Sequence, residues 1–176
     1  NLNCSYCYVY NKADTTWKHK PALMSDETFE TVLKRIRRYC LFTGQGVVNI
    51  VFHGGEPCLI GAKKFNAWCV RAHQVLQDVA TVALHMQTNG TLLDDSWIEA
   101  CSANRVGVGI SMDGPAQVHD LVRIDHSGRG SYEQVERAIK LLQRSDVPYG
   151  ILSVIPLGAD PLTVHRHFLA LGCTQI

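Results

Sequence analysis

The chain has 176 residues, of which 46% are hydrophobic and 19% are charged. That composition excludes disordered and collagen-like proteins, and the length suits one domain or a large piece of a bigger one. Lys and Arg number 17 against 16 Asp and Glu, a net charge of +1, so no basic field favours nucleic-acid binding. Because no apolar run approaches the about 20 residues of a membrane span, we expect no membrane partner either.

Helix-like and strand-like patterns alternate along the chain. Apolar residues at helical spacing follow Ser25, whose side chain can cap a helix, and Gly44 can end that helix. The next segment, Val47–Phe52, is mostly apolar, as a buried strand is. The predicted elements, in chain order, are a helix from Ser25 to the Gly44 region, strand 47–52, helix 63–78, strand 79–86, a helix from Asp94 or Asp95 through Ala103, strand 106–111, helix 131–144, strand 147–155 and helix 162–171.

This strict alternation predicts βαβ units with right-handed crossovers and a parallel sheet. The pattern alone does not separate a doubly wound sheet from a barrel. Residues 173–176 begin what we expect to be a fifth visible strand, and no strand precedes the loop around Cys4. We therefore expect residues of the fold to be missing at both ends of the chain.

Polar or glycine-rich loops follow three of the predicted strands. They are His53–Pro57, Gln87–Gly90 and Ser111–Pro115, and each could by itself be an ordinary turn or helix start. In parallel α/β folds the carboxyl ends of the strands share one rim, where functional loops gather. The loop around Cys4 would occupy the same rim if a strand preceded it, so the sequence predicts a site there.

Seven cysteines are present, an odd number, and most are scattered through apolar or mixed segments. A disulfide framework is therefore not expected, and a reducing, cytoplasmic location is. Cys4 and Cys7 differ because they lie close together in a loop-like segment. By itself, Cys-x-x-Cys is compatible with a redox dithiol, half of a zinc site or ligation of an iron–sulfur cluster. A zinc site would need a second pair of Cys or His residues at matching spacing. A thioredoxin-like dithiol would lie at the start of a helix, whereas the first predicted helix begins only at Ser25.

The motifs taken together resemble those of the radical S-adenosylmethionine (SAM) superfamily. More narrowly, they look like the peptide- and protein-modifying branch with C-terminal SPASM-type extensions, which includes cyclophane-forming peptide maturases and the anaerobic sulfatase maturases. One departure concerns the family motif Cys-x-x-x-Cys-x-x-Cys, whose first cysteine would lie immediately before Asn1. We interpret this as truncation of the sequence. The motifs that carry the resemblance are Cys4-x-x-Cys7, Gly54-Gly55-Glu56-Pro57, Thr88-Asn89-Gly90, Ser111-x-Asp113-Gly114-Pro115, His119-Asp120 and Arg123.

The resemblance implies a partial (β/α)6 barrel of the radical SAM type. Residues 1–176 would form its core domain, without the first strand and without the C-terminal SPASM-type domain. It also implies two cofactors, a [4Fe–4S] cluster and S-adenosylmethionine, and soft thiolate ligands suit such a cluster. The resemblance assigns Cys4 and Cys7 to the cluster.

The same resemblance implies a set of SAM contacts. Gly54, Gly55, Glu56 and Pro57 would form the loop that receives the amino group. His53, which precedes this loop, could either buttress it or pack within the strand, and strand packing is the favoured interpretation. Arg123 would offer its guanidinium fork to the carboxylate. The remaining contacts would come from Tyr6 on adenine, Ser111 and Asp113 on the ribose, and Asn89 elsewhere in the pocket. No catalytic acid or base is identifiable.

The implied activity is reductive cleavage of SAM to a 5′-deoxyadenosyl radical, which abstracts hydrogen from a small ribosomal precursor peptide. An electron donor such as flavodoxin or ferredoxin would be needed. Segments Tyr8–Tyr10 and Gly128–Tyr132 resemble those of crosslinking maturases, so we favour a carbon–carbon crosslink of the cyclophane type. The alternatives are conversion of Cys or Ser to formylglycine in a sulfatase, a non-catalytic iron–sulfur or peptide-binding module, and a structural zinc protein.

Overall fold

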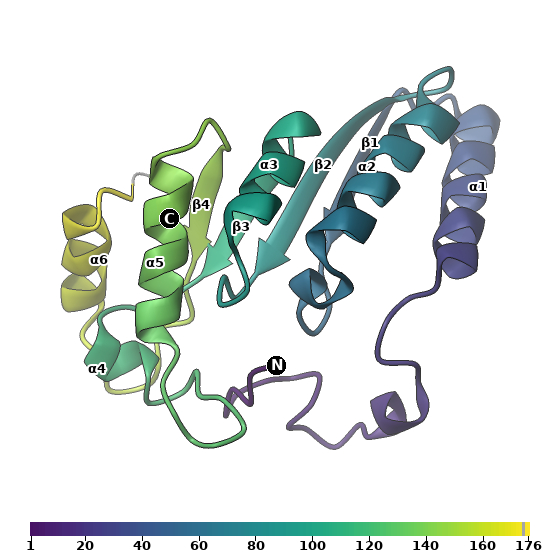
Figure 1. The fold of residues 1–176 in the computed structure, drawn as a ribbon. Coiled ribbons are helices and arrows are strands. Elements are labelled where there is room, and N and C mark those ends of the chain that lie inside the picture. Colours follow the sequence, from purple (N-terminus) through teal and green to yellow (C-terminus); the bar gives the residue numbers. More distant parts are fainter. Residues whose placement is uncertain (174) are drawn as a thin grey trace.

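A computed structural model describes residues 1–173 and 175–176. Its centre is a sheet of parallel strands in the order β1-β2-β3-β4, so strands that follow each other in sequence are neighbours in space (Figure 1). The predicted parallel α/β fold is therefore confirmed. The strands are β1 (Val47–Phe52), β2 (Thr81–Thr88), β3 (Gly107–Ser111) and β4 (Tyr149–Leu152).

Helices connect the strands and cover one face of the sheet (Figure 1). Ser25 caps the first of them, because its Oγ accepts a hydrogen bond from the Thr28 amide at 3.1 Å, and Gly44 ends it with φ of 71°. The long helices are α1 (Asp26–Thr43), α2 (Ala62–Leu76), α3 (Asp95–Ala103), α5 (Tyr132–Gln143) and α6 (Pro161–Ala170), and the short ones are η1 (Thr16–His19), η2 (Pro57–Ile60) and α4 (Ala116–His119).

The strand side chains alternate between a buried face and an open one. Met86 and Ile110 are almost completely buried beneath the helices, where each contributes about 1.5–3 kcal/mol through burial. On the opposite face Val51 and Leu152 are each more than half exposed. Helices on a single face are what a barrel requires, whereas a doubly wound sheet has helices on both. This burial pattern decides between the two arrangements that the sequence pattern left open.

Two strand boundaries differ from the prediction. β2 begins at Thr81 and continues to Thr88, so Gln87 and Thr88 belong to the strand and not to the following loop. β4 covers only Tyr149–Leu152, because the Val154 amide donates to the Asp113 side chain instead of continuing the ladder.

Two further predictions concern the ends of elements. Ser131 does not cap α5 with its side chain, because its Oγ donates to the Arg123 carbonyl at 2.8 Å. The predicted fifth strand includes Thr174, which lies outside the described residues, although the Ile151 amide does donate to the Gln175 carbonyl at 2.8 Å. No helix within the described part of the chain is both long and apolar enough to cross a membrane.

Candidate functional site

A cavity of about 260 Å³ lies at the carboxyl ends of all four strands. The N-terminal segment closes it from the other side and runs past the tips of the strands in Figure 1. Most of the predicted site residues therefore meet in one place, although they are far apart in sequence. Those that line the cavity are Cys4, Tyr6, Cys7, Gly54, Gly55, Asn89, Ser111 and Arg123.

Backbone hydrogen bonds hold the cysteine loop in position. The amides of Asn3 and Ser5 donate to the carbonyls of Ile124 and Val122 at 2.7 and 2.9 Å. Within the loop, the Cys7 amide donates to the Cys4 carbonyl at 3.0 Å, which makes a tight turn. Both thiols are thereby brought to the same cavity wall.

The two thiols carry soft sulfur atoms, the ligand type of iron–sulfur clusters. Both are free and half-buried. Burial raises the pKa of Cys4, which disfavours the thiolate that ligates metal, and the nearby Arg123 charge opposes that rise. The described residues contain no group of three or more His, Cys, Asp or Glu that could hold a metal ion. This chain thus offers two soft sulfur ligands beside a cavity, which fits two of the three ligands implied for the cluster.

The loop after β1 depends on its two glycines. Gly54 has φ of 142°, a conformation that side chains with a Cβ rarely adopt. At Gly55 an added Cβ would collide with the hydroxyl oxygen of Tyr10. The Gly54 amide donates to Nδ1 of His53 at 2.6 Å, so the His53 side chain supports this loop, whereas the sequence favoured a role in strand packing. The glycines allow the backbone itself to form part of the cavity wall.

Glu56 faces away from this cavity. Its Oε1 accepts hydrogen bonds from the Cys58 amide at 3.0 Å and from the Thr88 hydroxyl at 2.5 Å, and its Oε2 accepts from the Asn89 amide at 2.9 Å. The carboxylate is buried and ties the loop after β1 to the end of β2. Pro57 begins η2 and likewise does not line the cavity. The predicted contact of Glu56 with a SAM amino group therefore gains no support from this geometry.

Asp113 lies behind the cavity wall instead of at its surface. Its carboxylate is completely buried and pairs with Arg123 through Nε at 2.7 Å and Nη2 at 3.1 Å. Tyr6 also donates its hydroxyl to Asp113, at 2.6 Å, and burial, followed by this bond, raises the pKa of Tyr6. The prediction that Asp113 contacts the ribose gains no support, because its acceptor positions are taken by protein groups.

The same pairing uses only one edge of the Arg123 guanidinium. Two of its three guanidinium nitrogens donate to Asp113, and within the described part of the chain the third, Nη1, takes no hydrogen-bond partner. Asp113 takes the Nε hydrogen and one Nη2 hydrogen, so both Nη1 hydrogens and the second Nη2 hydrogen are left. A carboxylate in the cavity could therefore still meet Arg123 through the fork that Nη1 and Nη2 form, while Asp113 stays bound.

Gln87 lines the cavity. It belongs to a segment that was predicted at this rim, but no contact with a cofactor was predicted for Gln87 itself. Its Nε2 donates to the Ser111 hydroxyl at 2.9 Å, and Gly109 makes room for it because a Cβ there would collide with Oε1 of Gln87. The alternation of side chains along β2 could have indicated this residue, since Gln87 shares the open face with His85. Asn89 lies at the same rim and donates to Asn1 Oδ1 at 2.9 Å.

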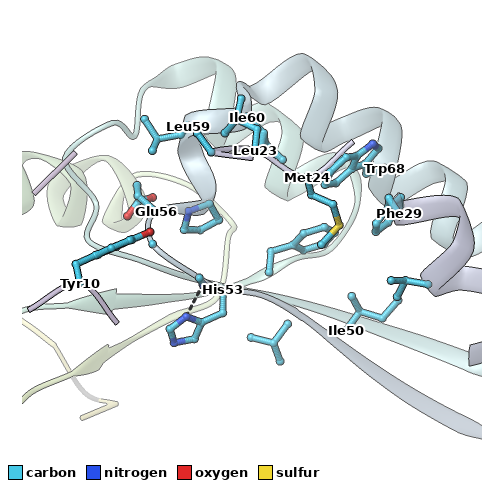
Figure 2. A pocket seen from close by; sticks show the side chains of 17 residues that line it. Tyr10, Leu23, Met24, Phe29, Ile50, His53, Glu56, Leu59, Ile60 and Trp68 are labelled. Atoms are coloured by element: carbon cyan, nitrogen blue, oxygen red, sulfur yellow. Dashed lines mark hydrogen bonds between the residues drawn. The ribbon is translucent and has the colours of Figure 1, made fainter. Parts of the chain in front are cut away.

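A second, apolar cavity of about 330 Å³ adjoins the first at the β1 edge of the sheet. The two cavities share Tyr10 and residues 53–55. Figure 2 shows Tyr10 and Glu56 at one end of this recess and Met24 and Trp68 at the other. No sequence motif indicates this recess, because its lining comes from segments whose contact depends on how the N-terminal loop folds back.

Comparison with known families identifies the class of protein. The model of the Radical SAM superfamily matches residues 1–165, so the chain belongs to this superfamily. Its cofactors are accordingly a [4Fe–4S] cluster and S-adenosylmethionine, as expected.

Among curated proteins, the chain is similar to anaerobic sulfatase-maturating enzymes. It is 35% identical over 155 residues to the cysteine-type enzyme of Clostridium perfringens, covering 88% of this chain and 41% of that protein. It is 33% identical over 178 residues to the serine-type enzyme of Bacteroides thetaiotaomicron, covering 100% and 42%. The chain thus spans less than half the length of these relatives.

Solved structures show the same relationship. The structure described as native anSMEcpe with bound AdoMet and Kp18Cys peptide is 32% identical to this chain, with a TM-score of 0.86. The match covers 99% of this chain and 46% of that one. The radical SAM fold that the sequence predicted is therefore confirmed, with anaerobic sulfatase maturases as close relatives.

Proposed function

We propose that this chain is the cofactor-binding part of a radical SAM enzyme that oxidises a Cys or Ser side chain of a protein substrate to formylglycine. The observation that carries this proposal is the 35% identity to a cysteine-type sulfatase-maturating enzyme across 88% of the chain. The crosslinking reaction that we favoured from the sequence finds no counterpart among these relatives. The sulfatase-type alternative therefore takes its place as the leading hypothesis.

The N-terminal wall of the cavity would bind the cluster, and the wall at the strand ends would bind SAM. Cys4 and Cys7 would hold the cluster from the N-terminal loop, together with a third ligand from outside this chain. The glycine loop, Asn89, Ser111 and Arg123 would hold SAM against it. When bound, the cluster supplies the electron that cleaves SAM, and the organic radical so formed removes hydrogen from the substrate.

The arrangement of the cavity supports a polypeptide substrate. The cavity opens at the strand ends beside a sheet face that no helix of residues 1–173 covers. Leu152 and Val154 line the cavity while remaining about half exposed. A peptide segment could approach along that face and exclude water from the reacting groups. The peptide bound in the similar structure supports the same class of substrate.

Three further assignments are part of the proposal. The electron donor would be a flavodoxin or ferredoxin, and the enzyme would work in the cytoplasm. Residues 1–176 would be the core domain of a longer protein whose SPASM-type domain follows.

The decisive experiment compares the products from three peptides. The polypeptide that contains this chain is reconstituted anaerobically and given SAM, a reductant and either the Kp18Cys peptide, its Cys→Ser analogue or its Cys→Ala analogue as a control. Formylglycine from the Cys peptide appears in mass spectra as loss of hydrogen sulfide with gain of an oxygen atom, and the aldehyde reacts with a hydrazide probe. We expect this product from the Cys peptide, the Ser peptide or both.

The two candidate reactions leave different products. A crosslink removes two hydrogen atoms from the peptide and leaves no aldehyde. A product that is lighter than the peptide by two hydrogens and does not react with the hydrazide probe would overturn the formylglycine proposal. SAM cleavage with all three peptides unchanged would overturn it as well, and would return the question to other peptide substrates.

A further inference from the structure

The carboxylate of Asp113 joins segments from three parts of the fold. It accepts hydrogen bonds from Tyr6 Oη at 2.6 Å, from Arg123 at 2.7 and 3.1 Å, and from the Val154 amide at 2.9 Å. These partners come from the cysteine loop, the segment after α4 and the segment after β4. Because no part of Asp113 is exposed to solvent, all four bonds form where water cannot replace them.

A second set of contacts holds Arg123 from behind. His119 is completely buried, and its Nδ1 accepts the Asp113 amide at 3.2 Å while its Nε2 lies 3.0 Å from Ser131 Oγ. Ser131 in turn donates to the Arg123 carbonyl at 2.8 Å. Both the backbone and the guanidinium of Arg123 are thereby fixed before any ligand enters the cavity.

The network reaches the cysteine loop at Tyr6. Tyr6 donates its hydroxyl to Asp113, and its ring also makes a cation–π contact with Arg123. The distance from the ring centre to Cζ of Arg123 is 5.4 Å. Tyr6 directly precedes Cys7 and lies two residues after Cys4, and all three line the cavity. The Ser5 amide is also bound, to the Val122 carbonyl next to Arg123. The position of Tyr6 within the Cys4–Cys7 loop therefore depends on Asp113 and Arg123.

We infer that Asp113 is a positioning residue for the cluster: through Tyr6 and Arg123 it sets the conformation of the Cys4–Cys7 loop in advance of cofactor binding. This role differs from the ribose contact that the family resemblance implied. It also goes beyond the proposed function, because it holds for any substrate and any fate of the radical. Preorganised ligands lose less conformational entropy when the cluster binds, and ligands held by their surroundings are more precisely placed.

The test starts with the cofactor-free polypeptide and the variant Tyr6→Phe, which removes one hydroxyl and keeps the ring. Loss of a hydrogen bond to a buried charge is expected to raise amide hydrogen exchange in residues 3–8, and the alkylation rates of Cys4 and Cys7, by about tenfold or more. Tyr39→Phe is the matched control, since Tyr39 is 60% exposed on α1. It should leave both rates unchanged.

The reconstituted polypeptide provides a second reading. In Tyr6→Phe we expect a changed electron paramagnetic resonance spectrum and a shifted reduction potential of the cluster. Asp113→Asn should change the spectrum and the potential in the same way. The double variant that combines both substitutions should show changes little larger than those of either single variant, because both act through one hydrogen bond. If Asp113→Asn does not fold, Tyr6→Phe alone decides. If the Tyr6→Phe variant shows the same exchange and alkylation rates as the unaltered protein, the inference is overturned, whatever the activity of the variant.

Discussion

The buried imidazole of His119 leads to a prediction about stability and pH. Its Nδ1 accepts the Asp113 amide, so the proton of the neutral ring must lie on Nε2, which donates to Ser131. Protonating Nδ1 would place two donors face to face in the interior. Burial, together with the nearby charge of Arg123, lowers the pKa of His119 from 6.5 to about 4.

The pKa difference sets the size and sign of the effect. Between about pH 6.5 and about pH 4 the unfolded chain binds a proton at this position and the folded chain does not. The free energy of unfolding therefore falls as the pH falls through that window. At 1.36 kcal/mol per unit, the whole loss is roughly 3 kcal/mol, of which about 2 kcal/mol is reached by pH 5.

Urea unfolding of the unaltered protein and of His119→Gln at about pH 7.5 and about pH 5 measures this contribution. Glutamine carries no titrating group, so the variant should lose about 2 kcal/mol less than the unaltered protein between the two conditions. Other groups, including His167, whose pKa is also lowered by burial, titrate in both proteins and cancel in the comparison. Equal losses in the two proteins would refute the reasoning.

Three further predictions concern the loop after β1 and two core thiols. Gly54→Ala should lower the free energy of unfolding by about 1–3 kcal/mol, since φ is 142°; denaturant titration measures this, and an unchanged midpoint would contradict it. Glu56→Ala should lower the free energy of unfolding by about 3 kcal/mol, because three buried donors lose their acceptor. The control Glu99→Ala, at an exposed position, should lower it by under about 0.5 kcal/mol. Cys69 and Cys101, whose pKa burial raises to about 12, should resist alkylation until the protein unfolds.

The location of the site was predictable because it depends on topology. Once parallel strands alternate with helices, the residues that follow each strand must meet at one edge of the sheet. Gly54, Asn89 and Ser111 therefore lie around one cavity, as their positions after successive strands predicted. The choice between a barrel and a doubly wound sheet was not predictable in this way, because the order of elements does not say which face the helices cover.

The orientations of the buried charges could not be predicted from motif positions. Asp113 pairs with Arg123 and with Tyr6, which is 107 positions away in sequence. A buried carboxylate must find enough donors to replace its lost hydration, and which donors are within reach is decided by how separate segments pack. Glu56 turns toward β2 for the same reason. Gln87 is different, because strand alternation alone would have placed it on the open face.

The central claim is that Cys4 and Cys7 hold a cluster that cleaves S-adenosylmethionine. The most direct measurement reconstitutes the polypeptide that contains this chain with iron and sulfide under anaerobic conditions, adds SAM and a reductant, and quantifies 5′-deoxyadenosine. We predict that the product forms and that it disappears in the Cys4→Ala/Cys7→Ala variant. A protein that binds zinc and no iron, or product formation that persists in that variant, would contradict the claim.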